Sequence, residues 1–380
     1  MQLLKLMHTL VKVGEPLPWN VRDGQGKLLL AHGHVIETTQ ELDHLIDRGA
    51  FVSAEEAREV ARRAAEIEKL RQQEQLRPAN LFTLWEHTLW QLDRLLRSVE
   101  EPGFTARADE LARHLASLVD RDADIAIYLC VRQDPKRLSI YGLAHAVHCA
   151  LVCLLVARRL GWDEPTVMTA VKAALTMNIA TLDLQGRLAA QGIAPTAAQH
   201  AQLAEHPERG AAMLRAAGVD DEAWLTAVLQ SHERRDGSGY PHRITEPTEM
   251  AQLLRHVDVF LAKISPRALR APMLTQLAAR QLFQEDQGGP IAAAIVKEVG
   301  LYPPGEFVKL KSGEHAVVVR RAANASMPTV ASITDRSGMP VIATVMRDTS
   351  KPEFAIVGPI ADKSQVVLRM PPERLYGLPE

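Results

Sequence analysis

The stretch SHERRDGSGYP, residues 231–241, is the most informative part of this 380-residue sequence. Asp236 favours a side-chain cap or an Asx-turn, because its short carboxylate reaches the backbone two residues further on. Gly237 and Gly239 permit positive φ, and Pro241 fixes φ at the exit of the loop. We therefore predict a rigid turn that directly follows the histidine-bearing end of a helix.

The sequence around this turn has the period of a helical bundle. From about residue 79 to residue 300, apolar residues recur three and four positions apart, which predicts helices joined by short polar loops. Near Tyr302 the pattern changes to alternation interrupted by Gly, Pro and Asp, so residues 303–371 are predicted to form strands. The predicted fold is mainly α, with a small N-terminal α/β module and a C-terminal β-rich appendage.

The first 75 residues differ from the bundle. Two short apolar runs flank DGQG, residues 23–26, which predicts a hairpin, and residues 38–49 predict a helix capped by Thr38 or Thr39. Residues 53–75 carry opposite charges four positions apart, typical of a solvated connector helix or one side of a coiled coil. The predicted domains are an N-terminal module (1–52), a helical connector (53–104), a helical domain (105–302) and a C-terminal extension (303–380).

Composition limits the classes of partner. A net charge of −2 argues against nucleic acid or an anionic membrane as partner, and 47% hydrophobic residues are ordinary for a soluble protein. The N-terminus is interrupted by Lys5, His8 and Lys12, so no signal peptide is predicted. The longest apolar run, residues 149–157, is too short to span a bilayer. These features predict a cytoplasmic protein.

Cysteine and tryptophan side chains are predicted to be core residues. Three cysteines cannot form a disulfide framework, and buried cysteines behave as small apolar residues in a reducing cytosol. The residues concerned are Cys130, Cys149, Cys153, Trp85, Trp90 and Trp224.

Side chains that commonly bind metals are scattered over four helical segments of the predicted bundle. They are His145, His148, His206, His232, His256 and Asp258. A bundle core can bring such ligands together, and imidazole with carboxylate suits transition metals. His148 follows His145 by one helical turn, and is either a substitute ligand or an ordinary helix histidine. His256 should face away from Asp258, two residues on, so we exclude it.

These motifs resemble the HD-GYP phosphohydrolases of bacteria, a branch of the HD superfamily associated with hydrolysis of cyclic di-GMP. In that family His-His-Glu runs into Asp-Gly-x-Gly-Tyr-Pro, and this chain matches from His232 onward. The resemblance covers roughly residues 105–305. It includes YGLAHAV around His145, EHPERGAAML around His206 and RHVDVFLAKISPR around Asp258.

The resemblance implies an HD-type bundle that holds two, sometimes three, iron or manganese ions, which generate a hydroxide and clamp the phosphate. Position by position, the implied metal ligands are His145, His206, His232 and Asp258. Tyr141 stands where three-metal members carry a glutamate, which argues against a third metal.

Several positions depart from the family pattern. Met177 and Asn178 occupy the His-Asp position, Ala180 and Thr181 replace Gly-Lys, and Ser231 replaces the first histidine of the His-His pair. A neutral amide cannot bridge two cations as a carboxylate does, so metal charge would stay uncompensated. We predict no dinuclear centre and no cofactor. The alternatives are a single zinc-type site of four N/O ligands or a set of mutually hydrogen-bonded polar groups.

The predicted function is that of a degenerate HD-GYP protein, a non-catalytic module that senses cyclic di-GMP or docks a signalling protein such as a diguanylate cyclase-type domain. The docking face would be Asp236, Gly237, Gly239, Tyr240 and Pro241, and the candidate phosphate contacts are Arg234, Arg235, Arg267 and Arg270. The alternative is a working phosphodiesterase with a reduced site, which would need two iron or manganese ions. A structural oligomerisation domain, or a homodimer through residues 53–75, also stays open.

Overall fold

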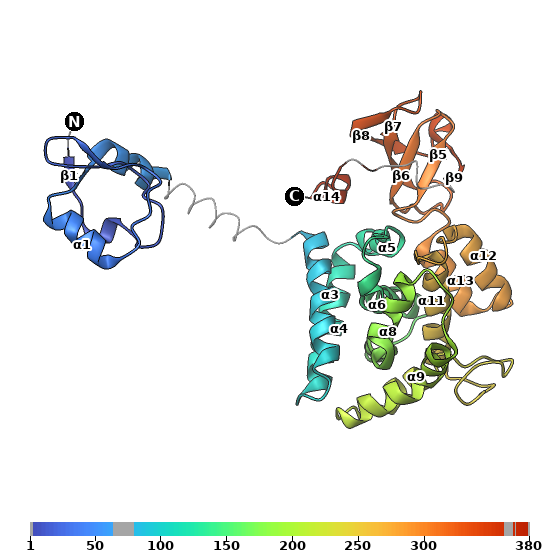
Figure 1. The fold of residues 1–380 in the computed structure, drawn as a ribbon. Helices are drawn as coiled ribbons and strands as arrows, with labels where there is room; N and C mark the ends of the chain where they lie inside the picture. The colour runs from blue at the N-terminus through green and yellow to red at the C-terminus, as the bar shows by residue number, and fades with distance from the viewer. Residues whose placement is uncertain (1–2, 64–79, 361–367, 369, 379–380) are drawn as a thin grey trace. The chain divides into compact units, whose positions relative to one another are not determined.

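The computed structural model describes residues 3–63, 80–360, 368 and 370–378 (Figure 1). Its internal contacts separate two compact units, Met1–Ala79 and Asn80–Glu380. The predicted boundaries at residues 52, 104 and 302 stay predictions, but α3 (Leu81–Arg97) lies in the second unit and packs against α4 (Phe104–Arg121) and α6 (Tyr141–Arg159).

The N-terminal unit is a small four-stranded sheet with one helix. The strand order is β1-β4-β2-β3, and each neighbouring pair is antiparallel. The elements are β1 (Leu3–Lys5), η1 (His8–Leu10), β2 (Val21–Arg22), β3 (Leu28–Leu30), α1 (Thr39–Asp47) and β4 (Phe51–Ser53). Its own core is formed by residues that include Leu6, Leu17 and Ile36.

The predicted hairpin and helix are both confirmed, and side-chain hydrogen bonds to nearby backbone explain why they form. Asp23 Oδ1 accepts hydrogen bonds from the backbone N–H groups of Gln25 and Lys27, both at 2.9 Å, which closes the turn between β2 and β3. The Thr38 hydroxyl caps α1 by accepting from the Glu41 N–H at 3.2 Å. Residues 54–63 are helical, whereas the rest of the predicted connector helix, 64–75, lies outside the described residues.

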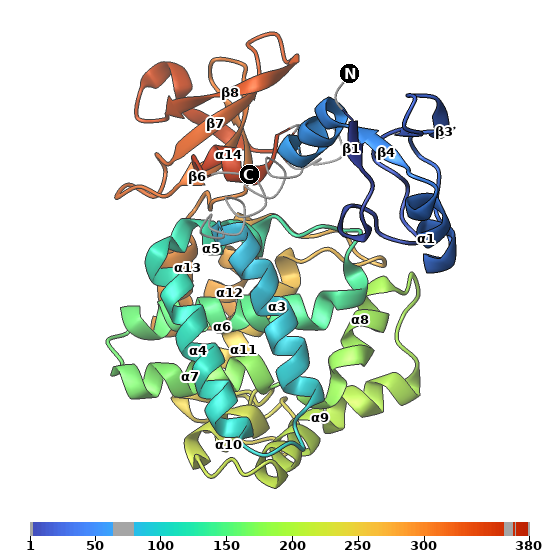
Figure 2. The same ribbon diagram turned by 90° about the vertical axis from the view of Figure 1, so that its left-hand side faces the viewer.

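The second unit begins with the helical bundle predicted from the 3.6-residue period, and the mainly α fold is confirmed (Figure 2). After α3 come α4 (Phe104–Arg121), α5 (Ala123–Val131), η2 (Leu138–Ile140), α6 (Tyr141–Arg159), α7 (Glu164–Thr176), η3 (Ile179–Thr181), α8 (Leu182–Ala190), α9 (Ala197–Ala216), α10 (Glu222–Leu229), α11 (Glu249–Ile264), α12 (Thr275–Glu285) and α13 (Pro290–Val299).

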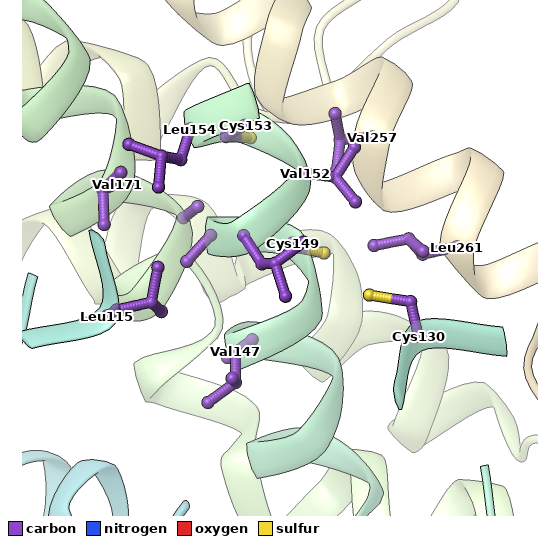
Figure 3. Packing of buried hydrophobic residues seen from close by; sticks show 14 of the residues in the cluster. Leu115, Cys130, Val147, Cys149, Val152, Cys153, Leu154, Val171, Val257 and Leu261 are labelled. Atoms are coloured by element: carbon purple, nitrogen blue, oxygen red, sulfur yellow. The ribbon is translucent and has the colours of Figure 1, made fainter. Parts of the chain in front are cut away.

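Helix α6 runs through the core and is buried on nearly every face. Figure 3 shows Cys149 and Val152 pointing toward Val257 and Leu261 of α11, while Leu154 points toward Val171 of α7. All three cysteines are buried and unpaired, as predicted.

The tryptophan prediction is confirmed at two positions and wrong at the third. Trp85 and Trp224 are buried, whereas the side chain of Trp90 is 50% exposed. Trp85 and Trp90 are five residues apart on α3, which separates them by about 140° around the helix. Both rings therefore cannot face the same core.

Two helical stretches are long and apolar enough to cross a bilayer by length and composition alone, Leu138–Arg159 and Glu164–Ala190. The apolar run at residues 149–157 underestimated the length of the first helix, because it left out the turns on either side of the run. However, 83% and 72% of their apolar windows are buried inside the protein, which is typical of core helices.

The C-terminal appendage is an antiparallel five-stranded sheet of order β8-β7-β6-β5-β9, which confirms the predicted change of period. Its elements are β5 (Phe307–Leu310), β6 (His315–Arg320), β7 (Thr329–Thr334), β8 (Pro340–Asp348), η4 (Pro352–Phe354), β9 (Ile356–Pro359) and the short helix α14 (Pro372–Leu375). Arg320 at the end of β6 donates to Asp122 at 2.6 Å, so the sheet is anchored to the start of α5.

Candidate functional site

The GYP loop, residues 231–241, follows α10 and forms the tight turn expected from its sequence, with a positive φ at Gly237 but not at Gly239. Asp236 Oδ1 accepts from the Ser238 N–H at 3.0 Å and from the Ser238 hydroxyl at 2.6 Å, which is an Asx-turn. Gly237 has φ +68°, and a Cβ on Gly239 would lie 2.4 Å from the Arg234 nitrogen. Pro241 follows Tyr240 through a cis peptide bond.

Glu233 holds this loop closed, a role that our sequence analysis missed. Its carboxylate is buried and accepts from the backbone N–H groups of His242 at 2.7 Å and Ile244 at 3.0 Å. The signal in the sequence was an acidic residue directly after His232, at a position too close to an apolar helix end to be solvated.

One group of candidate ligands comes from α6 and α11. His145 Nε2 donates to Asp258 Oδ1 at 2.8 Å, and Cys149 Sγ lies 3.5 Å from the same nitrogen. The donor atoms of these three residues all lie within 4.8 Å of one another. Cys149 was predicted to be a plain core residue, but it follows His145 by four residues on a helix and so shares its face.

His145 is held by a chain of hydrogen bonds. Arg267 Nη2 donates to the Tyr141 hydroxyl at 2.7 Å, and the Tyr141 oxygen lies 3.4 Å from His145 Nδ1. With Nε2 donating to Asp258, Nδ1 is the acceptor for the Tyr141 O–H. Both ring nitrogens of His145 are therefore engaged within the protein.

A second group joins α9 to the GYP loop. The rings of His206 and His232 have centroids 4.8 Å apart, and Tyr240 stacks on His232 at the same centroid distance with an interplanar angle of 7°. His206 Nδ1 donates to the Leu203 carbonyl at 2.6 Å, so Nε2 carries the lone pair. That Nε2 is buried without a hydrogen-bond partner among the described residues, as is Nε2 of His232.

Electrostatics couple the two groups. Burial raises the pKa of Asp258, but the hydrogen bond from His145 and the nearby imidazoles outweigh burial and lower it to about 2. Burial lowers the pKa of His232 to about 4 and also lowers that of His206. Burial raises the pKa of the Cys149 thiol well above its usual range. At neutral pH the carboxylate of Asp258 thus faces neutral imidazoles His206 and His232 and a protonated thiol.

The positions that depart from the family pattern provide no carboxylate. Met177 packs in the core, and the buried Asn178 Nδ2 has no hydrogen-bond partner among the described residues. Thr181 Oγ donates to the Asn178 carbonyl at 3.4 Å, and Ser231 Oγ donates to the Val228 carbonyl at 2.8 Å. Both hydroxyl groups therefore donate hydrogen bonds to nearby backbone carbonyls.

The other predicted residues are not all brought together. Of the four arginines, Arg267 is linked to the His145 chain, while Arg234, Arg235 and Arg270 are exposed. His256 Nδ1 donates to the Gln252 carbonyl at 2.6 Å and its Nε2 lies 3.1 Å from Asp286 Oδ1, outside both groups, as expected. Of the two interpretations of His148, the structure favours an ordinary helix histidine, because its side chain lines a cavity with Ala144 and Leu151 and is not part of the group of His145, Cys149 and Asp258.

The donor set does not fit two iron or manganese ions. A dinuclear centre needs a bridging anion, whereas the described part of the two groups contains one carboxylate, Asp258, and that carboxylate already accepts from His145. One ion is the most that these side chains suit, with His206 Nε2 as the best-prepared ligand because its other nitrogen is fixed by a carbonyl.

Asp258→Asn is expected to lower the free energy of unfolding by about 2 kcal/mol at pH 7, which corresponds to the lowered pKa of this carboxyl. Because the folded pKa is below the unfolded one, this stabilisation is present above about pH 4 and is lost as the pH falls toward about 2. Urea unfolding of both proteins measures it. Asp220→Asn, at an exposed position, is the control, and equal losses in the two variants would contradict the prediction.

Comparison with known proteins relates part of the chain to a family. A family model described as an HD domain matches residues 109–288, which include both groups and the GYP loop. The chain is 28% identical over 223 residues to the cyclic di-GMP phosphodiesterase PA4108 of Pseudomonas aeruginosa. Residues 109–288 therefore match the HD domain family, and the chain is similar over 223 residues to a cyclic di-GMP phosphodiesterase.

The match to the Pseudomonas protein covers 57% of this chain and 53% of the relative, so the chain spans about half the length of the curated relative it matches. A solved structure is also similar, described as Bd1817, a HDG"Y"P protein from Bdellovibrio bacteriovorus. Its TM-score is 0.48 at 14% sequence identity, and the match covers 78% of this chain and 99% of that chain.

Proposed function

We propose that this protein is a non-hydrolytic HD-GYP protein of cyclic di-GMP signalling, which binds the nucleotide beside the His145 group. The observation that carries the proposal is the hydrogen-bond chain from Arg267 through Tyr141 and His145 to Asp258. It engages the first histidine and the carboxylate with each other, and no second carboxylate is present among the described residues of the two groups to bridge metal ions.

Arg267 supports binding of a phosphate. Its guanidinium is half-buried, stacks on the Tyr141 ring at 4.9 Å, and keeps a buried Nε without a partner among the described residues. A fixed guanidinium is suited to a phosphate oxygen, because its planar donors are already oriented. Arg234 and Arg235 beside the GYP loop are exposed and are the residues that a docking protein would meet first.

The second candidate is a phosphodiesterase with a reduced metal site. It is favoured by His206, whose Nδ1 is fixed by the Leu203 carbonyl while Nε2 stays free. His232 Nε2 and Asp258 are the additional donors that such a site would use, with Cys149 as a further one if binding removes its proton.

The test is an anaerobic incubation of the full chain with cyclic di-GMP and Mn²⁺ or Fe²⁺, followed by chromatography and metal analysis. We expect no linear pGpG or GMP above a control without protein, and fewer than two metal ions per chain. Equilibrium dialysis should show nucleotide binding, and Arg267→Gln should weaken it about tenfold because a charge-assisted hydrogen bond is lost.

Arg113→Gln is the matched control, because Arg113 is exposed on α4 and is not among the candidate phosphate contacts. Its affinity for cyclic di-GMP should equal that of the unmodified chain. Product formation would establish the second candidate instead. No binding and no product would exclude nucleotide sensing, and would leave protein docking through the GYP loop as the remaining role of this branch.

A further inference from the structure

A cavity of about 170 Å³ lies between α3, α5 and α6 in the helical bundle. Figure 2 shows α3 crossing over α6 in this region, and the two helices are in contact. The lining is largely apolar and includes Phe82, Trp85, Leu89, Val147, His148 and Leu151. Its size is comparable to that of an engineered apolar cavity of about 150 Å³ that binds benzene.

This cavity lies on a different face of α6 from the candidate ligands. Ala144, Val147, His148 and Leu151 line it, and their spacing of three and four residues defines one stripe of the helix. His145 and Cys149 face Asp258 instead. Tyr141, four residues before His145, also lines the cavity, so a ligand there would touch the hydrogen-bond chain to His145 but not the donor atoms of His145, Cys149 and Asp258.

Two polar side chains in the lining have no partner. Trp85 Nε1 and His148 Nδ1 are buried without a hydrogen-bond partner among the described residues. Burial lowers the pKa of His148 to about 3, so this imidazole is neutral at pH 7 and has one N–H and one lone pair to offer. Leaving such groups unsatisfied costs stability, which a ligand with a matching polar group would recover.

The charges around the mouth cancel. Arg137 forms a two-point pair with Glu86, at 2.6 and 2.8 Å. Arg132 and Asp134 add one charge of each sign. No excess charge remains that would favour a charged ligand, and the apolar lining disfavours one.

We propose that this cavity is a binding site for a small uncharged ring compound with one hydrogen-bonding group, of the size of phenol or indole, which contacts His148. The apolar walls take up the ring, and the imidazole selects the polar group. The proposal does not depend on whether the HD-GYP site binds or hydrolyses a nucleotide.

The test measures binding of phenol and toluene to the full chain by ligand-observed NMR titration. The two probes have similar size, but only phenol can hydrogen-bond to an imidazole. His148→Phe retains a ring and removes the polar partner, so we expect phenol affinity to fall about tenfold relative to toluene affinity. Comparing the ratio of the two affinities cancels any general change in packing.

Ala144→Leu extends a side chain into the cavity from its partly exposed wall and should abolish binding of both probes. Ala106→Leu, at an exposed position of α4, is the matched control and should bind as the unmodified chain does. The proposal is overturned if the full chain binds neither probe, if Ala144→Leu still binds them, or if the affinity ratio is unchanged in His148→Phe.

Discussion

Lowering the pH from 6.5 to 4.5 is expected to reduce the free energy of unfolding by about 2 kcal/mol through His148 alone. The folded pKa of this histidine is about 3, lowered by burial, whereas the unfolded chain has the ordinary value near 6.5. The stabilisation is therefore fully present above about pH 6.5 and is lost as the pH falls toward the folded pKa. His232, with a pKa of about 4, acts in the same direction.

Urea unfolding at several pH values between 6.5 and 4.5 measures this effect. His148→Phe should remove the share of the pH dependence that belongs to His148, because phenylalanine does not titrate in the unfolded chain. His200→Phe, at an exposed position, should keep the original pH dependence. An identical slope in His148→Phe and in the unmodified chain would show that His148 is not a buried neutral imidazole.

Gly239→Ala is expected to lower the free energy of unfolding by about 3 kcal/mol, the upper range for overpacking a close contact. The added Cβ would lie 2.4 Å from the Arg234 nitrogen and 2.6 Å from the Glu233 Cα. These atoms belong to backbone, so the loop itself must move to relieve the contact. Because Tyr240 is the next residue, its stacking on His232 should be lost at the same time.

Gly192→Ala is the control for this substitution. A Cβ at Gly192 would meet nothing within 4 Å, so the change should alter stability by less than about 0.5 kcal/mol. Thermal unfolding compares the two variants, and the NMR signals of the His232 ring report the stacking. Equal stability of the two variants would show that the loop accepts a side chain at residue 239.

The contacts of the GYP loop explain how its sequence can be retained beside a site that lacks a bridging carboxylate. Gly239 allows the loop to pass close to residues 233 and 234, and Glu233 fixes the opposite side by accepting two backbone N–H groups. Each requirement is structural and none involves a metal ion. Under the proposed function, Asn178 and Ser231 in place of metal ligands would leave these packing reasons for the loop unchanged.

Local interactions made much of the fold predictable from the sequence. The turn at Asp23, the cap at Thr38 and the Asx-turn at Asp236 each depend on side chains that reach backbone a few residues away. Helical and strand periods report which face of each element is buried, so the bundle and the C-terminal sheet could also be recognised. The candidate ligands His145, His206, His232 and Asp258 were identified through the motifs that surround them.

Only the tertiary structure decided how those side chains are used. The sequence does not show that Arg267 and Tyr141 connect to His145, or that Cys149 Sγ lies next to His145 Nε2. These contacts depend on how α6 packs against α11 and the following loop. The exposure of Trp90 and the cavity around His148 likewise depend on where α3 crosses α6. Periodicity defines the buried face of one helix, whereas the contacts between two helices depend on their angle and register, which side-chain packing across the whole core determines.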